Sequence, residues 1–140
     1  MSEGNKEVVR RIEEAWNRND LDALDALFAP DFISHATVPG LPPGLAGAKL
    51  AHQTSLQSFP DRKVIIEDMV GDDEQVAVRC RMTGTNEGGL AWAGIPANGN
   101  RVDVQWISLY RLRDGQAVEH RAVMDVMGLM QQLGAIPTPA

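Results

Sequence analysis

Apolar residues along this chain follow two different periods, one in each part. In the first sixty residues they recur every three or four positions, which predicts helices over residues 6–18, 20–29 and 48–59. Asp20 can cap the second of these helices and Pro30 can end it. The N-terminal part therefore favours short amphipathic helices that each bury one side.

From residue 64 onward apolar and polar residues alternate, as in strands with one buried face. Asp114 and Gly115 form the strongest hairpin signal, because both positions tolerate a positive φ. Gly134 is placed to end a last short helix. The predicted strands are a short piece at 31–35, followed by 64–70, 75–85, 101–113 and 116–126.

This order of elements predicts one α+β domain over residues 1–140. Strands joined by tight hairpins pair antiparallel, and helices grouped at one end of the sequence cover one face of the sheet. A strongly twisted sheet covered in this way leaves a cone-shaped cavity, so we expect a curved antiparallel sheet around an apolar pocket. A chain of 140 residues needs no disulfide or metal to fold.

Charge and composition narrow the class of partner. The 13 Lys and Arg residues are outnumbered by 19 Asp and Glu residues, giving a net charge of −6, which argues against nucleic acid or an anionic membrane. No apolar run approaches the roughly 20 residues of a membrane span. The single cysteine, Cys80, forms no internal disulfide, which suits a cytoplasmic protein. We therefore expect a small molecule or another protein as partner.

Asp125 is the sharpest candidate for chemistry. It lies between Met124 and Val126 near the end of the last strand, and an apolar setting raises the pKa of a carboxyl and makes it a better base. On a strand it shares a face with Arg121, whereas His120 points the other way. The alternative is that Asp125 caps the final helix, a position that aspartate favours.

Other side chains are candidates for binding. His35, at the end of the short strand, can act as acid, base or hydrogen-bond donor, or serve only as a histidine with a backbone partner. The aromatic side chains can form flat walls for an apolar ligand, with plain core packing as the alternative. They are Trp16, Phe59, Trp92, Trp106 and Tyr110. No spacing of histidine or cysteine fits a metal site, and no glycine-rich loop fits a phosphate.

Several motifs follow one another in a characteristic order over nearly the whole chain. They are the run from Asn5 to Leu24, Ala29-Pro30-Asp31-Phe32 with His35, Phe59-Pro60-Asp61, Gly94-Ile95-Pro96 before Gly99, Asp114-Gly115 before Val118-Glu119-His120, and Asp125 with the run from Gly128 to Gly134. In this order they resemble the SnoaL-like polyketide cyclase family.

The resemblance implies the cone of the nuclear transport factor 2-like superfamily, shared with ketosteroid isomerases. It further implies a cofactor-independent enzyme without a metal, acting on a small hydrophobic carbonyl compound. The residue matching Asp125 would remove a proton α to a carbonyl, and the enolate would close a ring by intramolecular aldol addition. His35 would line the pocket and bind the substrate.

Two positions depart from the family pattern. Asn86 stands where members often have histidine, and Arg121 where they often have tryptophan. An arginine facing the pocket would bind an anionic group or lower the pKa of Asp125. These departures motivate a second hypothesis, a non-catalytic ligand-binding or dimerisation domain. An isomerase stays open because it uses the same enolate and the same residues, and water addition to a strained ring is a third option on this fold.

Self-association is also expected from the pattern. If Trp106 or Val104 faced outward from the open sheet, the strand would present an apolar patch suited to a homodimer or higher homo-oligomer.

Overall fold

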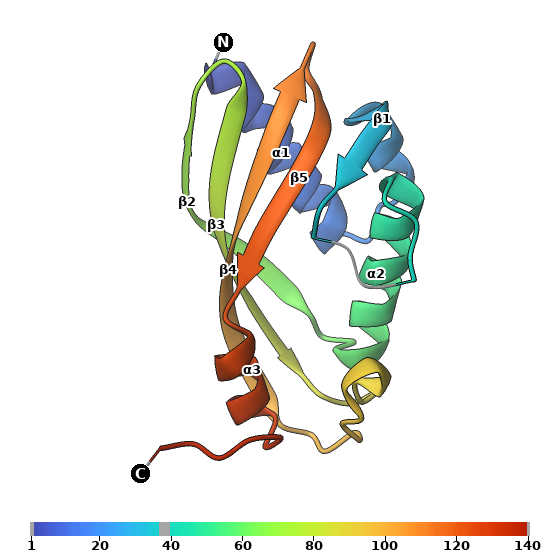
Figure 1. The fold of residues 1–140 in the computed structure, drawn as a ribbon, viewed down its shortest axis with the longest axis vertical. Coiled ribbons are helices and arrows are strands. Elements are labelled where there is room, and N and C mark those ends of the chain that lie inside the picture. The colour runs from blue at the N-terminus through green and yellow to red at the C-terminus, as the bar shows by residue number, and fades with distance from the viewer. Residues whose placement is uncertain (1, 37–39, 140) are drawn as a thin grey trace.

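A curved five-stranded sheet and the helices beside it make up the described part of the chain, residues 2–36 and 40–139 of the computed structural model (Figure 1). The elements in order are α1 (Ser2–Asn17), the 3-10 helix η1 (Asp22–Ala26), β1 (Phe28–Ser34), α2 (Leu45–Ser58), β2 (Lys63–Gly71), β3 (Gln75–Thr85), the 3-10 helix η2 (Ala91–Ala93), β4 (Arg101–Arg113), β5 (Gln116–Met124) and α3 (Val126–Gln132).

The strand order in the sheet is β1-β5-β4-β3-β2. Strands β2 to β5 form the antiparallel meander that the hairpin signals predict, and the α+β cone is confirmed. The fifth strand differs from the prediction, because β1 pairs with β5 in parallel and makes the sheet mixed. No hairpin joins these two strands, so no local signal in the sequence sets their relative direction.

Backbone conformation confirms two of the glycine signals and corrects one helix. Asp114 and Gly115 have φ of 52° and 76° at the β4–β5 turn, and Gly134 has φ of 77° just after α3. The predicted helix over 20–29 is reduced to η1, and Pro30 lies inside β1 instead of ending a helix. Because β1 is an edge strand, the missing N–H of proline is tolerated there.

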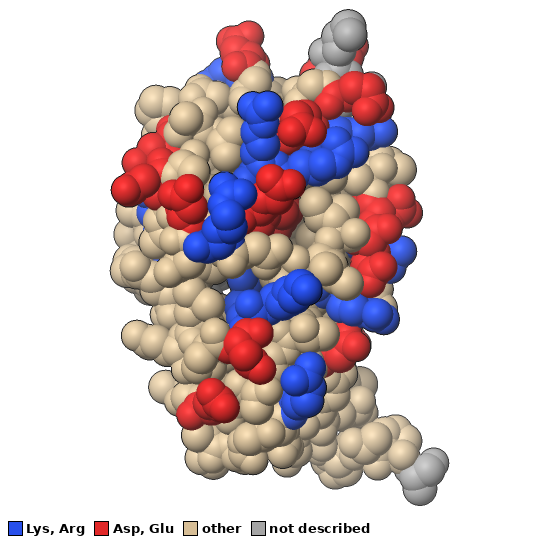
Figure 2. Space-filling view, turned by 180° about the vertical axis from the view of Figure 1, so that it is seen from behind, with Lys and Arg blue, Asp and Glu red and all other residues tan. Residues whose placement is uncertain are grey.

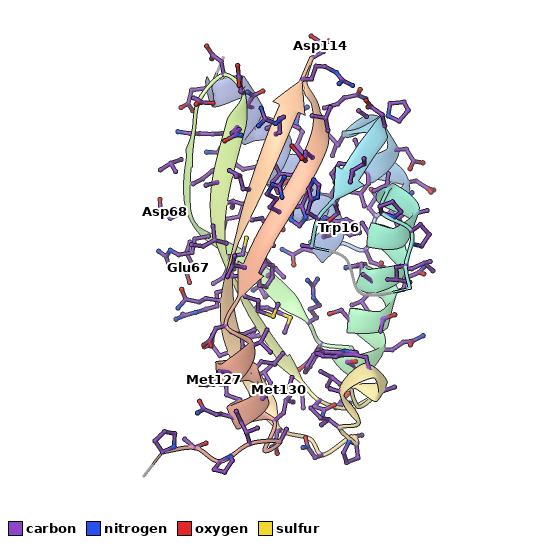
Figure 3. The ribbon with its side chains drawn as sticks, viewed as in Figure 1. Trp16, Glu67, Asp68, Asp114, Met127 and Met130 are labelled. Atoms are coloured by element: carbon purple, nitrogen blue, oxygen red, sulfur yellow. The ribbon has the colours of Figure 1, made fainter. Side chains whose placement is uncertain are left out.

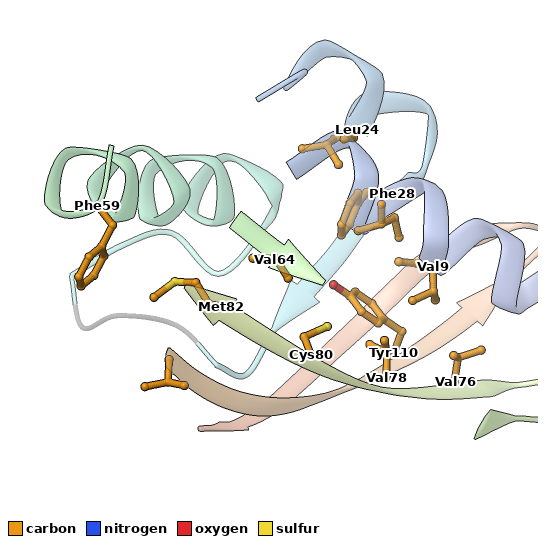
Figure 4. Close-up of a cluster of buried hydrophobic side chains, with 14 of the residues drawn as sticks. Val9, Leu24, Phe28, Phe59, Val64, Val76, Val78, Cys80, Met82 and Tyr110 are labelled. Atoms are coloured by element: carbon orange, nitrogen blue, oxygen red, sulfur yellow. The ribbon is translucent and has the colours of Figure 1, made fainter. Parts of the chain in front are cut away.

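The core forms where α1 crosses the inner face of the sheet (Figure 4). Val9 and Ile12 of α1 are fully buried, as is Val78 of β3, and Figure 4 shows Val9 facing Val78 and the ring of Tyr110. The side-chain amide of Asn17 donates to the Val64 carbonyl and accepts from the Val64 N–H, which ties the end of α1 to β2.

The alternation along β4 is as predicted, but the assignment of its apolar face to the outside is wrong. Val104 is 2% exposed and Trp106 is half-buried, because both point toward the helices. The outer face instead carries Ile107 and Val123, 51% and 79% exposed. Self-association therefore stays a prediction, now for a different set of residues.

Charged side chains are distributed over the outside of the molecule. On the face drawn in Figure 2 acidic and basic residues are interspersed, without a surface of one sign. Figure 3 shows Glu67 and Asp68 of β2 pointing away from the helices, whereas Trp16 lies between the sheet and α2. None of the helices in the described residues is long and apolar enough to cross a membrane.

Candidate active site

A cavity of about 760 Å³ opens between the inner face of the sheet and the elements α1, β1 and α2. Its volume lies in the range typical of small-molecule sites. The walls are mostly apolar, and all five aromatic residues named from the sequence lie in them: Trp16, Phe59, Trp92, Trp106 and Tyr110. Their contact with a ligand stays a prediction.

Asp125 lies outside this cavity. It is exposed and occupies the N-cap of α3, where its Oδ1 accepts a hydrogen bond from the Gly128 N–H at 2.9 Å. Because a helix leaves its first N–H groups without partners, a capping carboxylate has a sufficient structural role here. The position of Asp125 is therefore that of the alternative, an exposed helix cap instead of a buried carboxyl, and its catalytic role stays a prediction.

His35 and Arg121 also face away from the cavity. The Nε2 atom of His35 lies 2.7 Å from Glu119 Oε2, and Arg121 Nη2 lies 3.3 Å from the same oxygen. Both side chains are exposed on the outer surface. The expectation that they bind substrate is not supported, because the alternation along β5 directs Arg121 outward and His120 inward.

His120 is the functional candidate that the sequence interpretation set aside. Its Nδ1 lies 3.0 Å from Ser34 Oγ and its Nε2 lies 3.0 Å from Ser108 Oγ, and all three residues line the cavity. The ring packs against that of Tyr110 with 4.8 Å between centroids. Burial, followed by the nearby charge of His35, lowers the pKa of His120 to about 4, so the imidazole is neutral at pH 7.

Glu13 of α1 is a second candidate that was missed. It is 5% exposed and lines the cavity, and the hydroxyl of Tyr110 donates to its Oε1 at 3.2 Å. Burial raises the pKa of Glu13 to about 7, although the Tyr110 hydrogen bond and the charge of Arg62 act in the opposite direction. The helical period of α1 indicates this position of Glu13. It follows Val9 by four residues and precedes Trp16 by three, so its carboxylate lies in the apolar stripe of the helix.

Burial and the neighbouring Glu13 likewise hold the pKa of Tyr110 well above its usual value. Its hydroxyl therefore keeps its proton at neutral pH and acts as a donor. A buried donor of this kind can stabilise negative charge that develops on a ligand.

His52 of α2 and Arg62, between α2 and β2, occupy another part of the wall. Arg62 Nη1 lies 3.5 Å from His52 Nδ1, and the imidazole packs on Trp16 with 4.8 Å between ring centroids. Burial first and then the charge of Arg62 lower the pKa of His52 to about 4. Helix α1, helix α2 and the segment between α2 and β2 thus place Trp16, the neutral imidazole of His52 and the guanidinium of Arg62 next to one another.

The departure at Asn86 has a structural explanation. The side chain is fully buried, donates to the Pro96 carbonyl at 3.1 Å and accepts from the Gly89 N–H at 2.8 Å. These bonds shape the loop that carries Trp92. Among the described residues no three histidine, cysteine, aspartate or glutamate side chains are grouped as a metal site would require.

Comparison with known proteins agrees with this architecture. A model of the SnoaL-like polyketide cyclase family matches residues 6–133. The chain belongs to this family.

Three relatives illustrate the likeness. Aklanonic acid methyl ester cyclase DauD from Streptomyces sp. (strain C5) is 29% identical over 138 residues, which cover 95% of this chain and 84% of that protein. TsrD from Streptomyces laurentii superposes with a TM-score of 0.84 at 26% identity, over 95% of this chain and 96% of TsrD. IdmH, a proposed polyketide cyclase from Streptomyces antibioticus, gives 0.81 at 30% identity, over 93% and 98% of the two chains.

In this SnoaL-like chain the polar groups of the cavity form a connected series. Glu13 contacts Tyr110, Tyr110 packs on His120, and His120 contacts two serines. The series combines one carboxyl, Glu13, whose pKa is about 7, with several uncharged hydrogen-bonding groups. General acid–base catalysis uses groups of this kind, because proton transfer is most efficient when the pKa lies near the working pH.

Proposed function

We propose that this chain is a cyclase that removes a proton next to a carbonyl of a polyketide-like substrate and closes a ring by intramolecular aldol addition, without a cofactor. The observation that carries the proposal is Glu13: a carboxyl in the wall of an apolar cavity, with its pKa raised to about 7. Membership of the SnoaL-like family supports the reaction class.

The proposed reaction needs no redox partner. Ionised Glu13 takes the proton from the carbon between or beside carbonyl groups, and the electron pair moves onto the carbonyl oxygen to give an enolate. The enolate carbon attacks a second carbonyl carbon of the same molecule. One C–C bond forms, that second oxygen becomes an alkoxide, and it takes up the proton from Glu13 as a hydroxyl. Substrate and product therefore have the same mass.

Neutral donors are proposed to stabilise the enolate and alkoxide oxygens. Tyr110 donates its one hydroxyl proton to Glu13 in the resting protein. Once Glu13 has taken the substrate proton its carboxyl is neutral, and the hydroxyl of Tyr110, which its raised pKa keeps protonated, can turn to the enolate oxygen. His120 contacts the hydroxyls of Ser34 and Ser108 through its two ring nitrogens. As a neutral imidazole it donates to one hydroxyl and accepts from the other, so the serine that accepts from it is the one whose own proton is free for a substrate oxygen. Between apolar walls, fixed donors stabilise developing charge more strongly than they would in water.

The substrate class follows from the walls of the cavity. Trp16, Trp92 and Trp106 offer flat apolar surfaces on which fused rings can pack. The relative DauD is named for aklanonic acid methyl ester, which makes that compound the first substrate to test.

The experiment compares two carboxylates that were candidates for the base. Purified wild type, Glu13→Gln and Asp125→Asn would be incubated with aklanonic acid methyl ester, with product of unchanged mass followed by chromatography and mass spectrometry. We expect Glu13→Gln to lower kcat by about 10²–10⁴-fold, the usual contribution of a general base. Asp125→Asn should stay within about twofold of wild type, because asparagine also caps helices well.

The opposite result would return the catalytic role to Asp125: turnover lost in folded Asp125→Asn and retained in Glu13→Gln. Wild type that binds this ketone and leaves it unchanged would favour the second candidate, a ligand-binding domain without turnover. That candidate is favoured by the position of Asp125, which caps α3 instead of facing the cavity.

A further inference from the structure

We propose that Trp92 is a specificity-determining residue that selects ligands with an extended, uncharged ring system, by packing on the ring farthest from the reacting carbonyl. The inference rests on the proposed function, because it takes the cavity as the substrate site and Glu13 as its reactive end. It adds the length and the polarity of the preferred substrate. Three observations carry it, and all of them concern the opening of the cavity.

The first observation is the position of Trp92 at this opening. The residue lines the cavity and is nevertheless 61% exposed, so it lies where the cavity meets solvent. Trp16 and Trp106 line the same cavity but are half-buried and pack against the core. Glu13, at 5% exposure, lies in the interior. A ligand that contacts both Glu13 and Trp92 therefore extends from the buried part of the cavity to its opening.

The second observation is a frame of hydrogen bonds that holds Trp92 in its exposed position. Leu90 and Ile95, on either side of η2, exchange backbone hydrogen bonds of 2.8 and 3.1 Å, and both side chains are buried. The Ser58 hydroxyl at the end of α2 donates to the Gly89 carbonyl at 2.7 Å. The indole takes no part in these bonds, so the loop is fixed while the apolar faces of Trp92 stay available to a ligand.

The third observation is a second apolar side chain at the same opening. Met124, the last residue of β5, lines the cavity and is 40% exposed. It comes from the sheet, whereas η2 lies beside the end of α2 (Figure 1). Because a thioether packs favourably on aromatic rings, Met124 and Trp92 offer apolar contacts to a ring from two different elements.

These surfaces fit a flat, uncharged ring better than an ionised group. Helix η2 consists of Ala91, Trp92 and Ala93, so an ionised substituent would find no charged partner in it. Aromatic rings stack on indole in an offset arrangement, and covering an exposed indole removes apolar surface from water. The gain grows with the area covered, so a fused ring that reaches the opening should raise the affinity.

The test uses three uncharged ketones with the same cyclic ketone at one end and two, three or four linearly fused rings. They are 1-tetralone, 3,4-dihydroanthracen-1(2H)-one and 3,4-dihydrotetracen-1(2H)-one. Each has a single carbonyl and cannot cyclise, so equilibrium dialysis against the full-length protein measures binding without turnover. We expect Trp92→Ala to weaken binding of the four-ring ketone by about tenfold and that of the two-ring ketone by less than about twofold.

Two further variants separate this role from a general loss of apolar surface. Trp92→Phe keeps a flat ring and should retain most of the preference for the four-ring ketone. Trp106→Leu changes the inner wall and should weaken binding of all three ketones by similar factors. Because Trp92 is exposed, Trp92→Ala should fold like wild type, which circular dichroism checks.

A second measurement locates the contact directly. Each tryptophan gives one indole N–H signal in a proton–nitrogen NMR spectrum, and the signal missing from Trp92→Phe belongs to Trp92. We expect the four-ring ketone to shift this signal and the two-ring ketone to leave it nearly unchanged. The signals of Trp16 and Trp106 should shift with both ligands, because these residues line the inner part of the cavity.

Equal losses of affinity for the two-ring and four-ring ketones in Trp92→Ala, or no loss for either, would overturn the inference. A Trp92 signal that the four-ring ketone leaves unchanged would do the same. Light scattering supplies one more contrary outcome: a dimer of wild type that becomes monomeric in Trp92→Ala, with unchanged ketone affinities, would mean that a second copy of the chain covers Trp92.

The proposed cyclase activity fails separately, by the absence of product from aklanonic acid methyl ester. A dependence on ligand length at Trp92 without turnover therefore supports the role of Trp92 and contradicts the cyclase. Turnover without this dependence supports the cyclase and contradicts the role of Trp92.

Discussion

Two groups of histidine, arginine and glutamate lie on opposite sides of the same sheet, one on its outer face and one in the helical wall of the cavity on its inner side. On the outer face, His35 and Arg121 surround Glu119 at 2.7 and 3.3 Å, and these contacts lower the pKa of Glu119, with the His35 hydrogen bond as the largest cause. On the inner face, Glu13 and His52 lie in the cavity wall and have pKa values of about 7 and about 4.

The difference shows that chemistry here depends on environment more than on residue type. Outside, close partners favour the charged form of the carboxyl of Glu119. Inside, burial favours the neutral forms of the carboxyl and the imidazole, and only the guanidinium stays charged. The inner group is thereby suited to proton transfer and ligand binding, whereas the outer group is suited to solvation.

The largest expected difference in the free energy of unfolding is between an apolar residue buried beneath the inner face of the sheet and one exposed on the outer face. Ile12→Ala removes a fully buried side chain and should lower the free energy of unfolding by about 2–5 kcal/mol. Ile107→Ala, at 51% exposure on the outer face, should lower it by less than about 1 kcal/mol. Urea unfolding of both variants checks this, and equal losses would contradict the assignment of faces.

The next effect is a pH dependence of opposite sign in the two glutamates. Between about pH 4.5 and 7 folded Glu13 keeps a proton that the unfolded chain has lost, so its contribution to stability falls as the pH rises. Glu13→Gln should therefore become more stable relative to wild type over this range, by about 3 kcal/mol.

Glu119→Gln should show the reverse trend. Because folding lowers the pKa of Glu119, its stabilising contribution is present above the unfolded value of 4.5 and is lost as the pH falls through the folded one. The wild type should thus be more stable than Glu119→Gln only above the acid range. The difference in the free energy of unfolding should be small, since the contact is exposed to solvent. Urea unfolding at a series of pH values measures both differences, and slopes of the same sign would contradict the comparison.

The smallest expected effect belongs to the outer arginine. Arg121→Gln breaks an exposed ion pair with Glu119, and such pairs contribute about 0–1 kcal/mol and are screened by salt. A thermal melt should shift little at low salt and not measurably at 1 M salt. A large decrease in the melting temperature that salt does not reduce would mean that Arg121 makes a buried contact, which would contradict the structure.

Much of the fold was predictable from local pattern. The bounds of β3 and β4 match the predicted strands at 75–85 and 101–113, because period-two alternation persists to their ends. The parallel pairing of β1 was not predictable, because it depends on contacts between distant segments. The helix expected over 20–29 is only the short η1, and Pro30 lies inside β1, where an edge strand tolerates the missing N–H.

The site was harder to predict for a similar reason. Alternation tells which residues share a face of β5 but not which face meets the cavity, and apolar residues occur on both: Met124 with His120, and Val123 with Arg121. Because the face of β5 that carries Arg121 was interpreted as the inner one, Asp125 was selected as the base and His120 was not. Only the pairing of β5 with β4, where Ser108 lies opposite Ala122, identifies the inner side.

The alternation along β5 has a consequence for how such a protein can diversify. Consecutive codons specify side chains in separate compartments, since His120 contacts the cavity and Arg121 contacts solvent. A change at position 122 or 124 can alter the shape of the pocket while the surface stays constant, and a change at 121 or 123 can alter solubility or association while the pocket stays constant. Selection can therefore act on substrate preference and on surface properties almost independently, within one strand of nine residues.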